Sequence, residues 1–154
     1  MNYRAILLSL SPLCLIWFGI VIGISVIEAP AKFRAPSLTR EVALDVGRTV
    51  FGVLNKVELV ILALLLLTAC LRRRSIPSWV GIAALTAIVL LQTFWLLPEL
   101  GARTELILGG VEPEPSFTHG LYAVLELAKL ALLLALGVGG LARLSREAYT
   151  PDLR

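Results

Sequence analysis

The chain has 154 residues, of which 58% are hydrophobic and 16% are charged, and its net charge at pH 7 is +3. Its mean hydropathy is +0.88, whereas soluble domains are about half apolar and about a quarter charged. These values exclude an ordinary soluble domain. A small positive charge of this kind is typical of membrane anchoring and gives no reason to expect nucleic acid as a partner.

Four apolar stretches are each long enough to cross a hydrocarbon core of about 30 Å, which takes about 20 helical residues. They are Ala5–Ile27, Val50–Leu71, Trp79–Leu97 and His119–Leu141. We therefore predict an all-α integral membrane protein with the lipid bilayer as its surroundings. Its single domain, residues 1–154, is expected to be a bundle of four transmembrane helices arranged as two hairpins, with helices at about 5–27, 38–71, 79–97 and 119–144.

The first stretch is too long for a cleaved signal peptide, whose apolar region has about 7–15 residues. It is therefore expected to be retained, and Pro30 and Pro36 are expected to end it. Ser37 or Thr39 can cap the second helix, which should begin before the membrane and enter it as one long rod.

The third helix has Pro77 in its first turn, where proline is favourable. It is expected to end near Leu97, before Pro98. A loop of 21 residues, 98–118, would then connect it to the fourth helix and offer a small cap or a contact surface.

The orientation follows from the Lys and Arg residues near the helix ends. Seven lie on the side of the termini, including Arg72, Arg73 and Arg74 in one short turn, and five lie on the opposite side. We therefore expect both termini in the cytoplasm, with the protein in a plasma membrane of the bacterial inner-membrane type.

The second and fourth helices share a pattern that indicates an internal duplication. Residues 51–66 align with residues 119–134 at an offset of 68, which pairs Gly52 with Gly120 and Glu58 with Glu126. Leucine-rich helices also produce such matches by chance. A duplicated hairpin would have its symmetry axis along the membrane normal.

Polar residues recur at helical spacing inside three of the apolar stretches, which places them on common helix faces. In the third helix the spacing groups Gln92 with Trp95, Glu99 and Arg103. Across the helices the candidate binding residues are His119, Tyr122, Glu126, Lys129, Glu58, Asn55, Lys56 and Gln92. They would all occupy the outer half of the membrane.

Charged side chains in a membrane cost about 2.5–3.5 kcal/mol each on insertion scales and are therefore expected to form pairs. We predict Glu58 with Lys129 and Glu126 with Lys56, although Lys56 lies off the face that carries Asn55 and Glu58. Glu126 with Lys129, three residues apart, is the local alternative.

Two interpretations of these polar residues remain open. The cluster either locks the register of the helices or forms an outward-facing site that binds or passes an ion, a proton or a polar small molecule. The alternative function is an accessory or structural subunit that docks a membrane protein partner, or a second copy, through helix faces and the 98–118 loop. No catalytic motif is present, so an enzyme ranks last.

The sequence predicts no cofactor and no metal site. Haem ligation by two imidazoles requires a second histidine, and the chain has only His119. A zinc site built from His119, Glu126 and Glu58 is poor, because His119 and Glu126 are about two helical turns apart and reach one ion poorly. The glycines at 137, 139 and 140 are more typical of close helix packing than of a cofactor loop.

Several short motifs point to a known family. Phe33-Arg34 follows the first helix and Val50-Phe51 opens the second, while Trp95-Leu96-Leu97-Pro98 and Arg103 end the third and His119-Gly120-Leu121 opens the fourth. This order resembles the four-helix membrane family of transmembrane protein 205-like proteins and related bacterial domains of unknown function. The resemblance implies a compact four-helix bundle, and it assigns no role to Glu58, Glu126 or Lys129.

Overall fold

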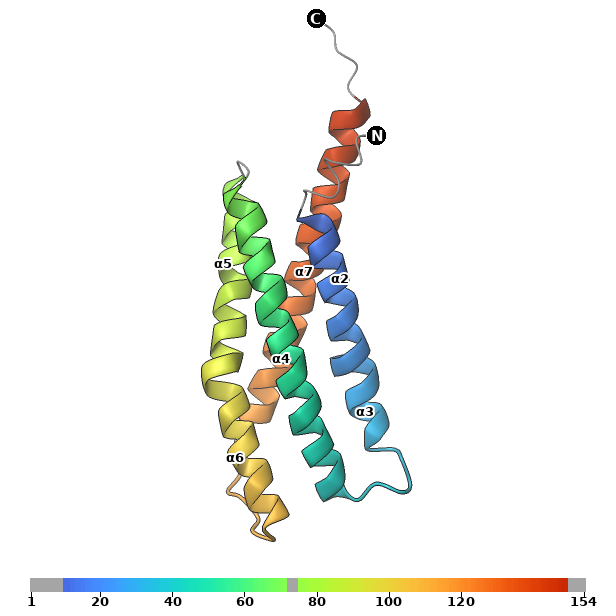
Figure 1. Cartoon of the computed structure of the whole chain (residues 1–154), viewed down its shortest axis with the longest axis vertical. Coiled ribbons are helices and arrows are strands. Elements are labelled where there is room, and N and C mark those ends of the chain that lie inside the picture. The colour runs from blue at the N-terminus through green and yellow to red at the C-terminus, as the bar shows by residue number, and fades with distance from the viewer. Residues whose placement is uncertain (1–9, 72–74, 150–154) are drawn as a thin grey trace, which may run out of the picture.

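The structure is a computed structural model that describes residues 10–71 and 75–149 (Figure 1). In these residues all regular secondary structure is helical. The elements are α2 (Ser11–Val21), η1 (Ile22–Glu28), α3 (Ala29–Lys32), α4 (Arg40–Cys70), α5 (Ile76–Leu91), η2 (Gln92–Leu96), α6 (Leu97–Leu108) and α7 (Thr118–Tyr149). The segments η1 and η2 are π-helices.

These elements join into four continuous helices that are long and apolar enough to cross a membrane, so the protein is an integral membrane protein. The spans are Ser11–Lys32, Arg40–Cys70, Ile76–Leu108 and Thr118–Arg143. The predicted fold class is thereby confirmed. The start of the first predicted helix and the Arg72–Arg74 turn, which supports the predicted orientation, lie outside the described residues.

Two helix starts agree with the capping chemistry read from the sequence. Thr39 has extended backbone geometry, and its side chain accepts a hydrogen bond from the Val42 amide at 3.4 Å. Helix α4 then runs as one rod of 31 residues. Pro77 lies in the first turn of α5, as predicted.

Pro30 and Pro98 do not end their helices, so the predicted helix ends at these prolines are wrong. The first span continues to Lys32, and the third continues through α6 to Leu108. In both cases a π-helix ends two residues before the proline. A π-turn bonds each N–H one residue further back than an α-turn, which relieves the clash between a proline ring and the carbonyl four residues earlier.

The loop between the third and fourth spans is consequently shorter than predicted. It comprises residues 109–117 instead of 98–118. Gly110 has a φ of 76°, and the Val111 amide bonds the Leu106 carbonyl, which closes the end of α6. This backbone geometry favours glycine. The third span therefore ends at Gly109-Gly110 and not at Pro98.

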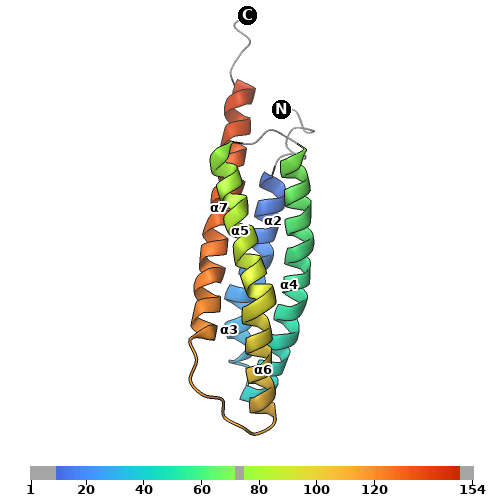
Figure 2. The same ribbon diagram turned by 90° about the vertical axis from the view of Figure 1, so that its left-hand side faces the viewer.

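The first and last spans pack closely at one end of the bundle and diverge toward the other in the view of Figure 1, whereas they run nearly parallel in the view of Figure 2. We call the end with the loops 33–39 and 109–117 the loop end, and the opposite end the turn end. Near the turn end, α2 and α7 make the most extensive contact between helices. A Cβ added at Gly137 would lie 2.7 Å from Leu15, and one at Gly140 would lie 2.2 Å from Ser11.

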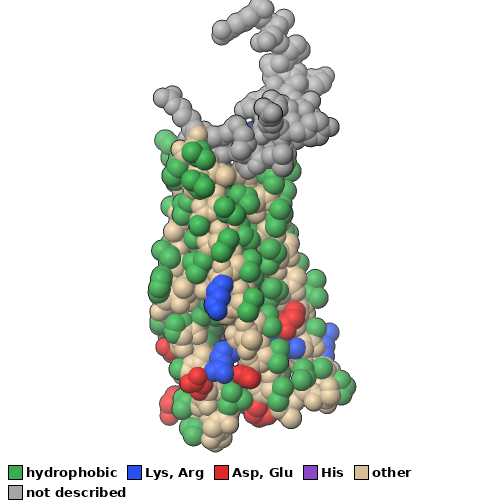
Figure 3. Space-filling model, viewed as in Figure 1, with side chains coloured by type: hydrophobic (Ala, Val, Ile, Leu, Met, Phe, Trp, Pro, Cys, Tyr) green, Lys and Arg blue, Asp and Glu red, His purple; other side chains and the backbone are tan. Residues whose placement is uncertain are grey.

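An apolar core fills the half of the bundle toward the turn end. Its fully buried members include Cys14, Trp17, Val21, Leu65, Leu85, Val89 and Leu133. On the face in Figure 3, apolar side chains cover most of the length, and charged side chains gather at the loop end. The bundle therefore has apolar sides compatible with lipid and an apolar core in one half. Its polar groups lie toward the loop end.

Candidate functional site

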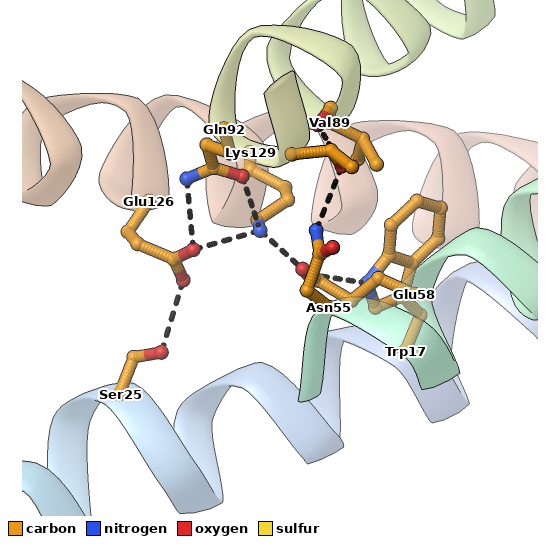
Figure 4. Close-up of polar contacts among 9 residues, drawn as sticks. Trp17, Ser25, Asn55, Glu58, Val89, Gln92, Glu126 and Lys129 are labelled. Atoms are coloured by element: carbon orange, nitrogen blue, oxygen red, sulfur yellow. Dashed lines mark hydrogen bonds and ion pairs between the residues drawn. The ribbon is translucent and has the colours of Figure 1, made fainter. Parts of the chain in front are cut away.

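Lys129 is the centre of a buried ionic cluster (Figure 4). Its Nζ lies 2.5 Å from Glu58 Oε1, 2.7 Å from Glu126 Oε1 and 2.9 Å from Gln92 Oε1. All four side chains are buried, and Lys129 is 0% exposed. We call Glu58, Gln92, Glu126 and Lys129 the ionic cluster. The predicted pair of Glu58 with Lys129 is confirmed, and the local pair of Glu126 with Lys129 forms as well.

Neutral donors complete the cluster. The Trp17 indole nitrogen donates to Glu58 Oε1 at 2.9 Å, and Gln92 Nε2 donates to Glu126 Oε1 at 3.0 Å. The Ser25 hydroxyl donates to Glu126 Oε2 at 3.0 Å. Each of the four spans therefore contributes at least one group, which fixes the helices against one another at this depth.

The ionic cluster contains two carboxyl groups and one ammonium group. Glu58 and Glu126 share Lys129, and no other cation of the described residues forms an ion pair with either carboxylate. No donor in the described part of the chain bonds Glu58 Oε2, which is buried. Buried carboxylates require positive charge or hydrogen-bond donors, so Glu58 Oε2 is an oxygen of the cluster that the described residues leave unsatisfied.

Both π-helices contribute a group to Glu126. Ser25 lies within η1, and Gln92 is the first residue of η2. They hold the two oxygens of the same carboxylate from different spans (Figure 4). Isolated π-turns within α-helices frequently occur at functional sites. Because both π-helices contribute a donor to Glu126, this residue is the strongest candidate for a functional group in the cluster.

A cavity of about 660 Å³ lies beside Glu126 in the half of the bundle toward the loop end. Its walls come from η1 and α3, α4, the start of α6, and α7, and they are mostly apolar. Glu126, Ser25 and Tyr122 are the polar residues at its deep end. Phe51 packs edge-on against Tyr122 with ring centroids 5.5 Å apart, which gives this end an aromatic wall.

Charged residues surround the cavity at the loop end. Lys32 Nζ lies 3.3 Å from Glu28, and Arg48 pairs with Asp45 and Glu105 at 2.8 and 2.9 Å. Lys32 is nevertheless buried: its side chain packs over Gly47, and its Nζ lies 5.4 Å from the Phe51 ring centre.

A second cavity, of about 240 Å³, lies further toward the loop end. His119 and Thr104 line both cavities, and Arg40, Arg103 and Glu112 line only the second. Its walls are more polar than those of the larger cavity, although Leu44, Leu100 and Ile107 line it as well.

The family model for a domain of unknown function, DUF4149, matches residues 13–106, more than half of the chain. The chain belongs to the DUF4149 family. The matched range contains Trp17, Ser25, Glu58 and Gln92 but ends before α7, which carries Glu126 and Lys129. Comparison with curated proteins and with solved structures finds no match.

The DUF4149 bundle brings together only some of the predicted binding residues. Tyr122 is buried beside the cluster and the cavity. Asn55 is buried too, but it donates to Thr93 at 2.9 Å. Among the described residues it forms no hydrogen bond with the ionic cluster. His119 is exposed, and it lies two helical turns from Glu126, where the two cavities meet.

The predicted pair of Glu126 with Lys56 is wrong. Lys56 is exposed and forms no ion pair with any described residue. The reason is its position on α4, one residue beyond Asn55 and two before Glu58, which turns it away from the buried face. Lys129 holds both carboxylates in its place.

The predicted polar face of the third span also fails. Gln92 is buried, but Trp95 is 45% exposed and Leu96 is fully buried. Spacing by α-helical turns assumes about 3.6 residues per turn, and η2 has more residues per turn than that. The π-helix therefore moves Leu96 into the position that the sequence assigned to Trp95.

Trp17 and Ser25 belong to the site but were absent from the predicted set. Trp17 is fully buried. The available signal was its place near the middle of an apolar helix, where an indole N–H requires a partner. For Ser25 the sequence carries no comparable signal, because a single serine in a membrane helix commonly bonds its own backbone.

Proposed function

We propose that this DUF4149 protein binds a small molecule in the larger cavity through Glu126. The ligand has a polar group that donates a hydrogen bond or carries positive charge, and an apolar remainder that fills the cavity. Glu126 Oε2 receives the polar group. The cavity volume lies in the range of about 300–1,000 Å³ typical of small-molecule sites, which are apolar with a few polar groups.

The observation that carries the proposal is the difference between the two Glu126 oxygens. Oε1 is held inside the cluster by Lys129 and Gln92. On the cavity side, the Ser25 hydroxyl donates to Oε2, and the Tyr122 hydroxyl also interacts with the Glu126 carboxylate. Glu126, Ser25 and Tyr122 all line the cavity. A carboxylate oxygen can accept more than one hydrogen bond, so Oε2 has capacity left for a ligand.

The packing supports binding rather than passage of an ion or a proton. Beyond the ionic cluster, toward the turn end, the interior consists of apolar side chains that include Val21, Leu65 and Leu85. A continuous path for an ion requires polar or water-filled surroundings along its length. The helix register is locked by Lys129, Glu58 and Gln92. Glu126 connects this lock to the cavity.

Replacing Glu126 by glutamine tests the proposal. Lys129 keeps Glu58 as its counter-ion, so the unfolding temperature should stay close to that of the wild type. Native mass spectrometry of protein extracted from its membrane should show a bound molecule on the wild type and much lower occupancy on Glu126→Gln. Lys56→Gln, an exposed charge change in the same bundle, is the matched control and should retain the bound mass.

Equal amounts of bound molecule on Glu126→Gln and on the wild type would contradict the proposal. A collapse of yield and unfolding temperature in Glu126→Gln would also count against it, because Glu126 would then be part of the lock.

The alternative function is that of an accessory subunit of a larger membrane complex. The loop 109–117 supports it, since Val111 and Phe117 are 55% and 71% exposed there. Exposed aromatic residues near a membrane surface contact either lipid headgroups or a protein partner. A defined hetero-complex in native mass measurements of the mildly extracted protein would favour this function, whereas a monomer or homodimer would oppose it.

We also propose that both termini face the cytoplasm of a bacterial inner membrane, so that the cavity is on the outer side. Support comes from the distribution of Lys and Arg between the two sides. A reporter enzyme that is active only outside the cytoplasm should be inactive when fused to the C-terminus and active when inserted in the 109–117 loop. The reverse pattern would overturn the orientation.

A relation between this DUF4149 chain and transmembrane protein 205-like proteins is a further proposal. Its support is the order of Phe33-Arg34, Val50-Phe51 and Trp95-to-Pro98 within the matched range. A structure of such a protein should show π-turns before the corresponding prolines, and continuous α-helices there would contradict the relation.

A further inference from the structure

We infer that the cavity opens sideways into the lipid bilayer between the first span and α7, so that its ligand is a lipid-soluble amphiphile. The hydroxyl or amine head of this molecule lies at Glu126, and its apolar tail extends through the opening into the membrane. This inference rests on the proposed binding function and specifies the ligand class and its route.

The opening follows from the packing of the first and last spans. At the turn end, Gly137 and Gly140 allow α2 to lie directly against α7. Toward the loop end, η1 and α3 make little or no close contact with α7, and the helices diverge in the view of Figure 1. Across this gap the hydrogen bond from Ser25 to Glu126 marks the narrow end.

The rims of the opening are apolar and exposed at the depth of Glu126. Val26, next to Ser25, is 48% exposed, and Leu127, next to Glu126, is 64% exposed. Both residues line the cavity, and both lie within membrane spans. Because the surroundings at this depth are lipid chains, the cavity is open to the hydrocarbon region on this side.

The loop end offers a poor route for an apolar molecule. Lys32 and Arg48 line the cavity there and are engaged in ion pairs. The second cavity beyond them has arginine, glutamate and histidine walls. A water-soluble ligand would pass these charged groups, but it would then meet the mostly apolar walls of Phe51, Leu97 and Leu130. The lining therefore matches a molecule that arrives from the bilayer.

A fluorescent probe at Gly52 can distinguish the two routes. A Cβ at Gly52 meets nothing within 4 Å, and Gly52 lines the cavity. The protein carries Cys70→Ser to remove the exposed thiol, and Gly52→Cys is labelled with a small bimane dye in phosphatidylcholine vesicles. Quenching is measured with a doxyl-labelled phosphatidylcholine and, separately, with aqueous iodide.

Two labelled positions provide the controls. Val53→Cys lies at the same depth on the lipid-exposed side of α4, and Gly120→Cys lies on an exposed position near the loop end. We expect the Gly52 label to behave like the Val53 label, with doxyl-lipid quenching several-fold stronger than at Gly120 and with weak iodide quenching.

Iodide quenching at Gly52 that equals that at Gly120, with weak doxyl-lipid quenching, would overturn lateral entry. Absence of quenching by either agent would overturn it as well, because the cavity would then be closed to the bilayer. Neither result affects the proposed binding function, which depends on the mass bound to the wild type and to Glu126→Gln.

Discussion

At the residue scale, Lys129 is the side chain whose loss the bundle should tolerate least. Lys129→Met leaves Glu58 and Glu126 buried without a counter-ion. Removal of one partner from a buried ion pair costs about 3–5 kcal/mol. We expect a large drop in the unfolding temperature of the detergent-purified protein, or no folded protein at all.

A combined variant keeps this prediction testable if the single variant does not fold. Glu58→Gln, Glu126→Gln and Lys129→Met together remove all three charges and should recover much of the lost stability, because neutral replacement of a buried ion group is often tolerated. Lys56→Met, at an exposed lysine, should unfold like the wild type. If Lys129→Met alone also unfolds like the wild type, the ionic cluster is not a lock.

Trp17 provides a second prediction about the ionic cluster. Trp17→Phe keeps an aromatic ring in the core but removes the indole donor to Glu58. Hydrogen bonds to charged groups contribute about 1.5–3 kcal/mol, so we expect a loss of stability near that size, measured by chemical or thermal unfolding. Trp95→Phe is the control, since Trp95 is partly exposed and no described group bonds its indole nitrogen. Equal effects of the two changes would mean that packing, and not the hydrogen bond, makes Trp17 important.

The residues also show how far sequence reasoning extends at this scale. Helical spacing correctly predicted that Lys129 meets Glu58, because both lie on α-helical stretches where spacing determines the face. Helical spacing also places Lys56 off the face that carries Asn55 and Glu58, so the predicted pair of Lys56 with Glu126 is wrong because it disregards that spacing. The role of Ser25 depends on the angle at which the first span approaches α7, which no local pattern encodes.

At the element scale, the two hairpins share more than the sequence alignment suggested. Pro30 and Pro98 are separated by the same 68 residues as Glu58 and Glu126. A π-helix precedes each proline. Ser25 and Thr93 are separated by this offset as well, and each bonds a polar side chain of the second helix in the other hairpin. These correspondences strengthen the predicted duplication.

The π-helices also explain why the elements were predicted only in part. Apolar length was sufficient to find all four spans, and the cap at Thr39 and the first-turn proline Pro77 indicate the starts of α4 and α5. Proline is normally a helix stop, and the sequence rules contain no signal for a π-turn that accommodates it. Consequently the sequence predicts loops at α3 and α6, where the structure has helices.

The close contact of α2 with α7 gives a prediction about elements. Gly140→Leu would place a side chain where Ser11 lies, whereas Gly139→Leu meets no described neighbour within 4 Å of its Cβ. Overpacking costs about 1–3 kcal/mol, so Gly140→Leu should lower the unfolding temperature and Gly139→Leu should not. Equal unfolding temperatures for these two variants would contradict the close packing of the first and last spans.

At the scale of the whole molecule, the bundle has one half with a closely packed apolar core and another half with cavities. The apolar core fills the half toward the turn end, and the ionic cluster lies at the boundary between the halves. The larger cavity occupies the other half, between spans that have diverged. Under the proposed function, the apolar half stabilises the fold and the other half receives the ligand.

The central claim is that a small molecule binds in the larger cavity. The most direct test is to fill part of this cavity with a new side chain and to measure whether the molecule still binds. Gly52→Leu adds a side chain to open space in the larger cavity, and Gly120→Leu adds the same side chain at the corresponding position of the other hairpin, outside both cavities. Native mass spectrometry should show a bound molecule on the wild type and on Gly120→Leu, and none on Gly52→Leu, with similar unfolding temperatures for all three. Equal occupancy in the three proteins, or no bound molecule on the wild type, would contradict the account.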